Sequence, residues 1–167
     1  MRSPRPAARP RHRKIVPLGA LAQIVRRAKA SGRTVVLTNG CFDLLHPGHV
    51  DLLERARRYG DLLIVALNSD GSVKALKGPQ RPILPQRDRA TLLAALAGVD
   101  FVTIFHDPTP QRVIARLRPQ VLVKGADWGP QAVVGRDVVE RDGGRVVRIP
   151  LVTGYSTTRL IERLSAS

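Results

Sequence analysis

Residues 38–56 read TNGCFDLLHPGHVDLLERA, and this stretch decides the fold. A run of β-forming residues ends at Thr38, where this stretch begins. Pro47 then stands where the first position of a helix favours proline, because the missing N–H would have no partner there. His46 therefore lies at the mouth of a helix, and His49 falls on the same side of its first turn. No acidic residue precedes Asp51 in that turn, so the positive end of the helix dipole is left for an anion such as a phosphate.

The rest of the chain repeats this change from strand to helix. Apolar runs of strand length occupy residues 34–38, 62–67, 101–105, 121–123 and 145–149. Helix-length segments occupy residues 18–30, 48–59, 86–97, 110–117, 131–141 and 157–164. We interpret the segment rich in Gly, Pro and Lys before residue 86 as a loop. The alternation predicts an α/β fold, a Rossmann-like three-layer α/β/α sandwich around a five-stranded parallel sheet, which binds ligands at the carboxyl ends of its strands.

Length and composition are those of one domain without a membrane segment. The 167 residues contain no apolar run of the roughly 18 residues that a membrane helix needs. The single cysteine excludes an internal disulfide, and the Arg-rich start lacks the apolar part of a secretory signal. We therefore expect a cytoplasmic protein with no membrane partner.

The net charge of +15 has two interpretations. It could serve a nucleic acid or a phosphorylated partner, or it could reflect a general preference for Arg, because only five of the 28 basic residues are Lys. Six basic residues lie in the first 14 positions, so we expect residues 1–14 to be a disordered basic tail and residues 15–167 to form the domain. A basic nucleic-acid-binding module remains an alternative, but aromatic residues for base stacking are few, and we expect no specific nucleic-acid partner.

A second helix mouth lies in residues 153–164, TGYSTTRLIERL. Ser156 is a favoured N-cap residue, but Arg159 stands where Glu or Gln would close a capping box. The hydroxyl groups of Ser156, Thr157 and Thr158 then face outward. An ordinary cap is the alternative for this segment taken alone, whereas two such mouths at one edge of the sheet suit a polyphosphate.

Three of the five lysines follow strands. Lys74 and Lys77 lie after the second strand, in NSDGSVKALKGPQRP, and Lys124 follows the apolar VLV at the end of the fourth. Lysine brings a compact charge to a phosphate. In a chain that otherwise prefers arginine, these positions indicate phosphate contacts.

The stretch GCFDLLHPGH together with YSTT resembles the HxGH nucleotidyltransferases of the cytidylyltransferase-like superfamily. Members of that superfamily transfer a nucleoside monophosphate from a nucleoside triphosphate to a phosphorylated acceptor. The segments LIVALNSDGSVKALKGPQRPI and DPTPQRVIARLRPQVLVKGADW are similar to those of bacterial D-glycero-β-D-manno-heptose 1-phosphate adenylyltransferases. These enzymes make ADP-heptose for the lipopolysaccharide core, so the resemblance implies that activity and the fold described above.

Differences in sequence from related enzymes indicate which members of the superfamily this chain resembles most. Cytidylyltransferases for glycerol 3-phosphate carry an RYVDEV-like segment and an Arg before GISTT, whereas this chain has AGVDFV and Leu151. A cytidylyltransferase acting on glycerol 3-phosphate or another phosphorylated acceptor remains the alternative. Only a short tail and one helix precede the first strand, so we expect a stand-alone form without the sugar-kinase domain of the bifunctional heptose enzymes.

The resemblance also implies roles for the matching residues. The catalytic residues are His46, His49 and Lys74. The nucleotide-binding residues are Gly40, Cys41, Phe42, Gly48, Lys124, Gly125, Asp127, Ser156, Thr157 and Thr158. The acceptor-binding residues are Asp43, Asn68, Lys77 and Arg87, although Asp43 could instead hold its loop and Arg87 could be an ordinary surface residue. The implied substrates are ATP and a sugar 1-phosphate, with Mg²⁺ held by the phosphates and by no direct protein ligand, and relatives are commonly homodimers.

Overall fold

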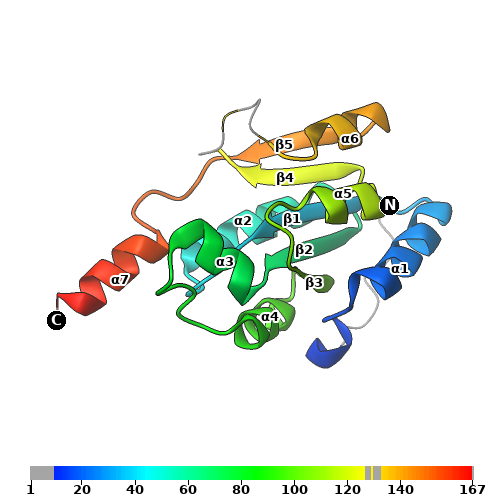
Figure 1. Cartoon of the computed structure of the whole chain (residues 1–167). Helices are drawn as coiled ribbons and strands as arrows, with labels where there is room; N and C mark the ends of the chain where they lie inside the picture. Colours follow the sequence, from blue (N-terminus) through cyan, green and yellow to red (C-terminus); the bar gives the residue numbers. More distant parts are fainter. Residues whose placement is uncertain (1–9, 127–128, 130–132, 167) are drawn as a thin grey trace.

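The five expected strands form one sheet in the computed structural model, which describes residues 10–126, 129 and 133–166 (Figure 1). The strands are β1 (Val35–Gly40), β2 (Leu62–Asn68), β3 (Phe101–Phe105), β4 (Val121–Gly125) and β5 (Arg145–Ile149). Their order is β3-β2-β1-β4-β5, and every neighbouring pair is parallel. The Rossmann-like parallel sheet predicted from the sequence is confirmed.

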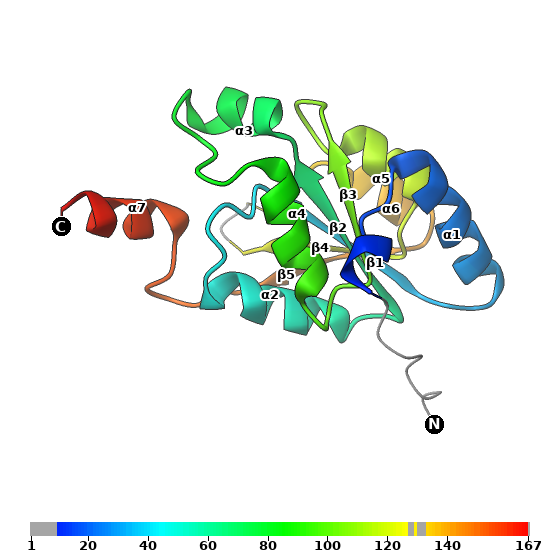
Figure 2. The same ribbon diagram turned by 90° about the horizontal axis from the view of Figure 1, so that it is seen from below.

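Helices cover both faces of the sheet, as Figures 1 and 2 show. They are α1 (Leu18–Ala30), α2 (Pro47–Arg57), α3 (Asp70–Lys77), α4 (Gln86–Ala95), α5 (Gln111–Leu117), α6 (Arg136–Arg141) and α7 (Thr157–Ser165). Helices α1, α5 and α6 lie on one face, and α2 and α4 lie on the other. Successive strand residues alternate between the two cores, so that Leu37 packs toward α1 and Val36 toward α2. Burial on both faces explains why β1 and β2 are nearly continuous apolar runs. No helix in the described part of the chain has the length and apolar character to cross a membrane.

The strand order reverses at β1. Strands β2 and β3 follow on one side of β1, and β4 and β5 follow on the other. The carboxyl ends of β1 and β4 therefore form the topological switch point, where open α/β sheets bind their ligands. The loop from β1 to α2 leaves the sheet there and carries the two histidines of the opening stretch.

Residues 70–77 form helix α3, which corrects the predicted loop. Ser69 caps this helix, because its Oγ accepts a hydrogen bond from the backbone N–H of Ser72. Ser72 and Val73 are buried on its inner side, and Gly78 ends it with a φ of 101°. The Gly and Lys residues of this segment favoured a loop prediction. The segment is instead a short amphipathic helix, which is stabilised by packing on β2.

Helix α6 begins at Arg136, later than the predicted residue 131. Gly135 precedes the helix with a φ of 85°, and a Cβ added there would clash with Cδ1 of Ile114. The close approach of this turn to α5 sets the start of the helix. Residues 131 and 132 lie outside the described residues.

Residues 10–14, which the sequence placed in the basic tail, make contacts with the fold. Arg11–Arg13 forms a turn of 3-10 helix. Lys14 is buried, and its Nζ donates to the carbonyl oxygens of Leu96 at 3.1 Å and Val99 at 2.8 Å. Backbone hydrogen bonds also join this segment to β3. The last four positions of the predicted disordered tail are thus held by contacts with residues far along the chain.

Candidate active site

His46 and His49 stack against each other at the N-terminus of α2. Their ring centroids are 3.8 Å apart, and the rings lie within 17° of parallel. His46 is the N-cap residue and Pro47 the first helical residue, but the imidazole makes no capping hydrogen bond. In the described part of the chain, the Nδ1 atoms of both rings are buried without a hydrogen-bond partner. The two rings therefore share one side of the helix mouth, as their spacing predicted.

Burial keeps this histidine pair neutral. Desolvation is the main cause that lowers the pKa of His49 to about 4; the charge of His46 contributes in the same direction, and Asp43 acts in the opposite direction. Desolvation also lowers the pKa of His46. At neutral pH each ring is thus an uncharged imidazole with one N–H donor and one acceptor nitrogen. A phosphate beside the pair would accept hydrogen bonds and favour protonation of the rings.

Gly48 makes room for the pair. A Cβ at this position would lie 3.1 Å from Cε1 and Nδ1 of His46 and 3.3 Å from Cβ of Tyr155. The Tyr155 ring lies 6.1 Å from the His46 ring and within 19° of parallel. Glycine therefore lets the segment before α7 approach the start of α2, while the contact of Gly48 with a nucleotide stays a prediction.

The loop between β1 and α2 has an unusual backbone. Phe42 and Leu44 have φ values of 44° and 51°, a region that costs a non-glycine residue about 1–3 kcal/mol. The Phe42 ring is buried, lies 5.2 Å from the His49 ring, and would be 3.0 Å from a Cβ added at Gly40. Packing of this ring offsets the backbone strain and positions the loop beneath His49.

Asp43 holds this loop to the segment before α4. Its carboxylate is buried and accepts hydrogen bonds from Arg81 Nε at 2.8 Å and from the backbone N–H groups of Ile83 at 2.8 Å and Leu84 at 3.1 Å. Burial alone would raise the pKa of Asp43, but these three donors hold it below its ordinary value. The observed contacts are those of the loop-holding alternative.

Arg89 is a buried residue of the site that the sequence did not single out. Its guanidinium donates to four oxygen atoms, those of the carbonyls of Cys41, Asn68 and Leu84 and of the Asp70 carboxylate. The side chain is 0% exposed. It therefore ties the carboxyl ends of β1 and β2 to the start of α3.

The second helix mouth meets the first. Ser156 Oγ accepts a hydrogen bond from the backbone N–H of Arg159 at 3.1 Å, and Thr157 Oγ1 donates to the carbonyl oxygen of Asp43 at 2.7 Å. Thr158 is exposed. The first turns of α2 and α7 both lack acidic residues. The structure thus brings two helix N-termini without acidic compensation to one edge of the sheet.

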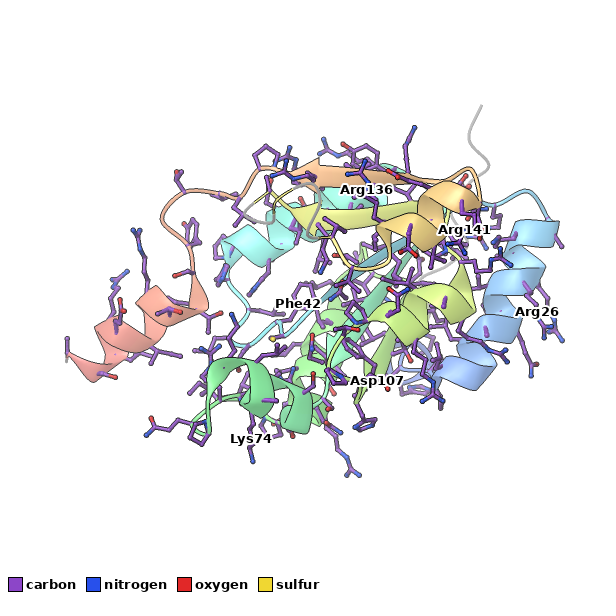
Figure 3. All side chains as sticks on the ribbon, turned by 45° about the horizontal axis from the view of Figure 1, so that its top comes forward. Arg26, Phe42, Lys74, Asp107, Arg136 and Arg141 are labelled. Carbon is purple, nitrogen blue, oxygen red and sulfur yellow. The ribbon has the colours of Figure 1, made fainter. Side chains whose placement is uncertain are left out.

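The two lysines of α3 differ in their relation to this edge. Both lie in the last turn of the helix and are exposed. Burial raises the pKa of the Cys41 thiol, and the charge of Lys77 lowers it in part. Figure 3 shows Lys74 on the side of α3 turned away from Phe42. Lys77 is therefore the lysine whose charge reaches the loop after β1, whereas the sequence favoured Lys74.

Two residues predicted to bind the acceptor lie on the β2 side. Asn68 is buried at the end of β2, and its amide donates to Ser72 Oγ at 2.9 Å. Arg87 is exposed in the first turn of α4. The Asn68 side chain is thus held by a hydrogen bond within the protein, whereas the Arg87 side chain is exposed to solvent.

The end of β4 forms the other side of the switch point. Lys124 is buried there, and Gly125 is the last residue of the strand. Asp127, which the sequence placed beside the nucleotide, lies outside the described residues. Among the residues that the structure describes, no group of three or more His, Cys, Asp or Glu side chains could hold a metal ion.

A family model described as Cytidylyltransferase-like matches residues 37–163. The chain belongs to the cytidylyltransferase-like family. Among its relatives, the bifunctional protein HldE of Geotalea uraniireducens is 56% identical over 151 residues, which are 90% of this chain and 31% of that protein. The bifunctional protein HldE of Magnetococcus marinus is 54% identical over 144 residues, 86% of this chain and 30% of that protein. The chain thus spans less than a third of the length of these two relatives.

Solved structures share the fold of this family member. The lipopolysaccharide core biosynthesis protein of Thermoplasma volcanium superposes with a TM-score of 0.60 at 25% identity, covering 75% of this chain and 100% of that one. The pantoate-beta-alanine ligase of Francisella tularensis superposes with a TM-score of 0.60 at 13% identity, covering 90% of this chain and 76% of that one. The second likeness concerns the fold alone.

Proposed function

We propose that this chain is an adenylyltransferase that transfers AMP from ATP to a sugar 1-phosphate, with D-glycero-β-D-manno-heptose 1-phosphate as the acceptor. The observation that carries the proposal is the stacked, neutral histidine pair at the mouth of α2, joined to the second helix mouth. Membership of the cytidylyltransferase-like family supports nucleotidyl transfer. Similarity to the bifunctional proteins HldE and to a lipopolysaccharide core biosynthesis protein supports ADP-heptose as the product.

The proposed reaction requires positioning and charge stabilisation. A phosphate oxygen of the sugar 1-phosphate attacks the α-phosphorus of ATP, a new P–O bond forms, and the bond to pyrophosphate breaks. Because the nucleophile is already an anion, no strong general base is needed. Negative charge builds on the equatorial oxygens and on the leaving group, and preorganised donors aimed at that charge lower the barrier.

His46 and His49 are the donors in this proposal. Their lowered pKa values make them neutral before substrate binds, so they bond to phosphate through N–H groups. As negative charge builds, the rings become stronger donors and gain proton affinity. Their interaction is thus stronger in the transition state than in the ground state, which is the condition for raising kcat.

The N-terminus of α7 holds the β- and γ-phosphates in this proposal. The Thr157 hydroxyl already donates to Asp43, so Thr157 offers phosphate its backbone N–H, while Ser156 and Thr158 offer hydroxyl groups. Mg²⁺ prefers oxygen ligands and keeps several waters, so it fits a site where phosphates hold it. Bound there, it would neutralise phosphate charge.

Lys77 is our candidate for the phosphate-binding lysine of α3, with Lys74 second, because the charge of Lys77 reaches Cys41. Lys124, Gly125 and Asp127 remain the residues that we assign to the adenosine side. Asn68 and Arg87 remain assigned to the acceptor. A homodimer and a cytoplasmic location, where ATP is available, belong to the same proposal.

The test is a panel of acceptors and nucleotides with pyrophosphate release as the readout. The acceptors are D-glycero-β-D-manno-heptose 1-phosphate, glucose 1-phosphate, glycerol 3-phosphate and FMN, each with ATP and with CTP. We expect the heptose phosphate with ATP to give the highest kcat/KM, because VLVKGADW matches the heptose enzymes and Leu151 replaces the cytidylyltransferase Arg. Equal or higher values with CTP and glycerol 3-phosphate would move the chain to the cytidylyltransferase alternative.

A further inference from the structure

Helix α7 carries an apolar face that its own chain covers only in part: Leu160 and Ile161 are half-buried, and Leu164 is exposed. Leu160, Ile161 and Leu164 share one side of the helix by their spacing, and Leu164 is 73% exposed. None of the α7 residues that the structure describes is buried. Figures 1 and 2 show the helix projecting from the rest of the molecule. An amphipathic helix of this kind gains stability by placing its apolar face against another surface.

A groove of about 560 Å³ lies along the outer side of α2. Its apolar lining includes Leu45, Val50 and Leu96. Its charged lining residues are Glu54 and Asp51, whose carboxylate lies 3.5 Å from Nη1 of Arg55 on the same helix. The chain as a whole has 28 basic and 13 acidic residues. A partly apolar groove that carries the Glu54 carboxylate, on such a basic molecule, fits a partner that is apolar on one face and basic beside it.

The α7 helix of a second copy has this chemistry. Arg163 lies one turn from Leu160 and next to Leu164, so a basic side chain borders the apolar face. Arg159 adds a second positive charge one turn earlier. We propose that α7 of one copy binds in the α2 groove of another, with its leucines against Leu45 and Val50 and its arginines beside Asp51 and Glu54.

The position of the groove allows the exchange to be reciprocal. His46 lines the groove and also stacks near Tyr155, which directly precedes α7. The hydrogen bond from Thr157 to Asp43 fixes the start of α7, and the helix then runs away from its own body. Groove and helix thus lie at one corner of the molecule. A two-fold axis beside this corner lets each helix enter the other copy's groove, so the same contact forms twice.

This contact completes the site in the function proposed above. The segment that holds Ser156, Thr157 and Thr158 is attached to its own chain at the start of α7, and the partner's groove holds the rest of the helix. Dimerisation therefore steadies the phosphate-binding mouth. Loss of the contact should raise the KM for ATP more than it lowers kcat.

The first test is Leu164→Asp, with mass measured by size-exclusion chromatography and light scattering. We expect the unsubstituted chain to be a dimer at about 50 μM and the variant to dissociate with a Kd at least about tenfold higher, which is about 1.4 kcal/mol. Leu76→Asp is the matched control, because Leu76 is also exposed and lies on α3, away from the groove. A monomeric unsubstituted chain, including one with α7 folded back onto its own groove, or a variant as dimeric as the control, would overturn the proposal.

The second test exchanges charges across the contact. Glu54→Arg alone should raise the Kd of the dimer about tenfold, and Glu54→Arg combined with Arg163→Glu should restore much of the loss. Both positions are exposed, so each variant should retain the melting temperature of the fold at low protein concentration. A double variant as weak as Glu54→Arg would overturn the pairing. Because these masses are measured without substrate, their outcome is independent of which acceptor the enzyme uses.

Discussion

The hydroxyl of Thr157 donates a hydrogen bond of 2.7 Å to the carbonyl oxygen of Asp43, across 114 residues of sequence. The carboxylate of Asp43 meanwhile accepts from Arg81 and from the backbone before α4. One residue therefore joins the loop after β1, the segment before α4 and the start of α7. The two helix mouths are therefore coupled through hydrogen bonds within the protein.

Thr157→Val tests this coupling, because valine keeps the shape of the side chain and removes the donor. We expect kcat/KM for ATP to fall about tenfold, since the lost hydrogen bond contributes about 1–1.5 kcal/mol to holding the mouth in place. Steady-state kinetics with ATP as the varied substrate measure the change. Thr153→Val is the control, because Thr153 is exposed in the same connection. Equal effects at the two positions would contradict the coupling.

His49→Ala tests the donor role of the histidine pair. We expect kcat to fall about 100-fold or more, the scale for removing one preorganised donor to a developing charge. The KM for ATP should change less, because the contact strengthens in the transition state. His106→Ala serves as the control, since His106 is exposed after β3. A near-normal turnover in the His49 variant would exclude the assigned role.

Arg89→Met tests the buried guanidinium. The substitution leaves three carbonyls and the Asp70 carboxylate without their donor, so we expect the free energy of unfolding to fall by about 3–5 kcal/mol. Denaturant titration followed by circular dichroism measures it. Arg87→Met, two positions earlier on the exposed side of α4, should change stability by less than about 0.5 kcal/mol. Similar losses in both variants would show that Arg89 has no special structural role.

The sequence predicted what local pattern encodes. The apolar alternation gave the sheet and its layers, and Pro47 marked the start of α2 with a histidine on either side of the Pro-Gly pair. These signals depend on neighbours along the chain, where capping and periodicity act. The family model matches residues 37–163, which contain these local motifs and make up most of the chain.

The missed features depend on contacts between distant residues. Helix α3 is short and rich in Gly and Lys, so its packing on β2 decides its conformation. Arginine and lysine are residue types usually found at the surface. Arg89 and Lys14 nevertheless donate hydrogen bonds to carbonyl oxygens of residues far away in the chain. For Arg89 a signal was available, because it lies one turn before the buried Leu93 on α4, and helical spacing places both on the inner side.

Two variants of the N-terminal segment test its charge and its structural contacts separately. We expect a chain that begins at Pro10 to keep kcat within about twofold, because steering of an anionic substrate by distant charges is screened over about 8 Å at physiological ionic strength. Lys14→Met should instead lower the free energy of unfolding by about 1–3 kcal/mol, since it removes the buried donor of two hydrogen bonds, to the carbonyl oxygens of Leu96 and Val99. Activity assays and denaturant titrations measure the two effects. A large loss of kcat in the shortened chain, not reproduced by high salt in the full chain, would show that residues 1–9 contribute to the site.

The lowered pKa of His49 predicts how stability depends on pH. The folded-state pKa is about 4, below the ordinary value of 6.5, so between these pH values the unfolded chain binds more protons than the folded one. The free energy of unfolding therefore rises with pH through this window, and the contribution of His49 is lost as pH falls from 6.5 toward 4. His46, whose pKa is also lowered, acts in the same direction.

His49→Gln removes the titrating group and keeps a polar side chain at the site. Between pH 4.5 and pH 7 we expect the variant to gain about 1–2 kcal/mol less stability than the unsubstituted chain, a figure reduced for the partial exposure of the ring. Denaturant titrations at both pH values measure the difference, and His106→Gln, at an exposed position, is the control. If the His49 variant and the unsubstituted chain gain equal stability, the imidazole is not held neutral by burial. The histidine pair would then bind phosphate as a cation, and the argument that it strengthens only as charge develops would fail.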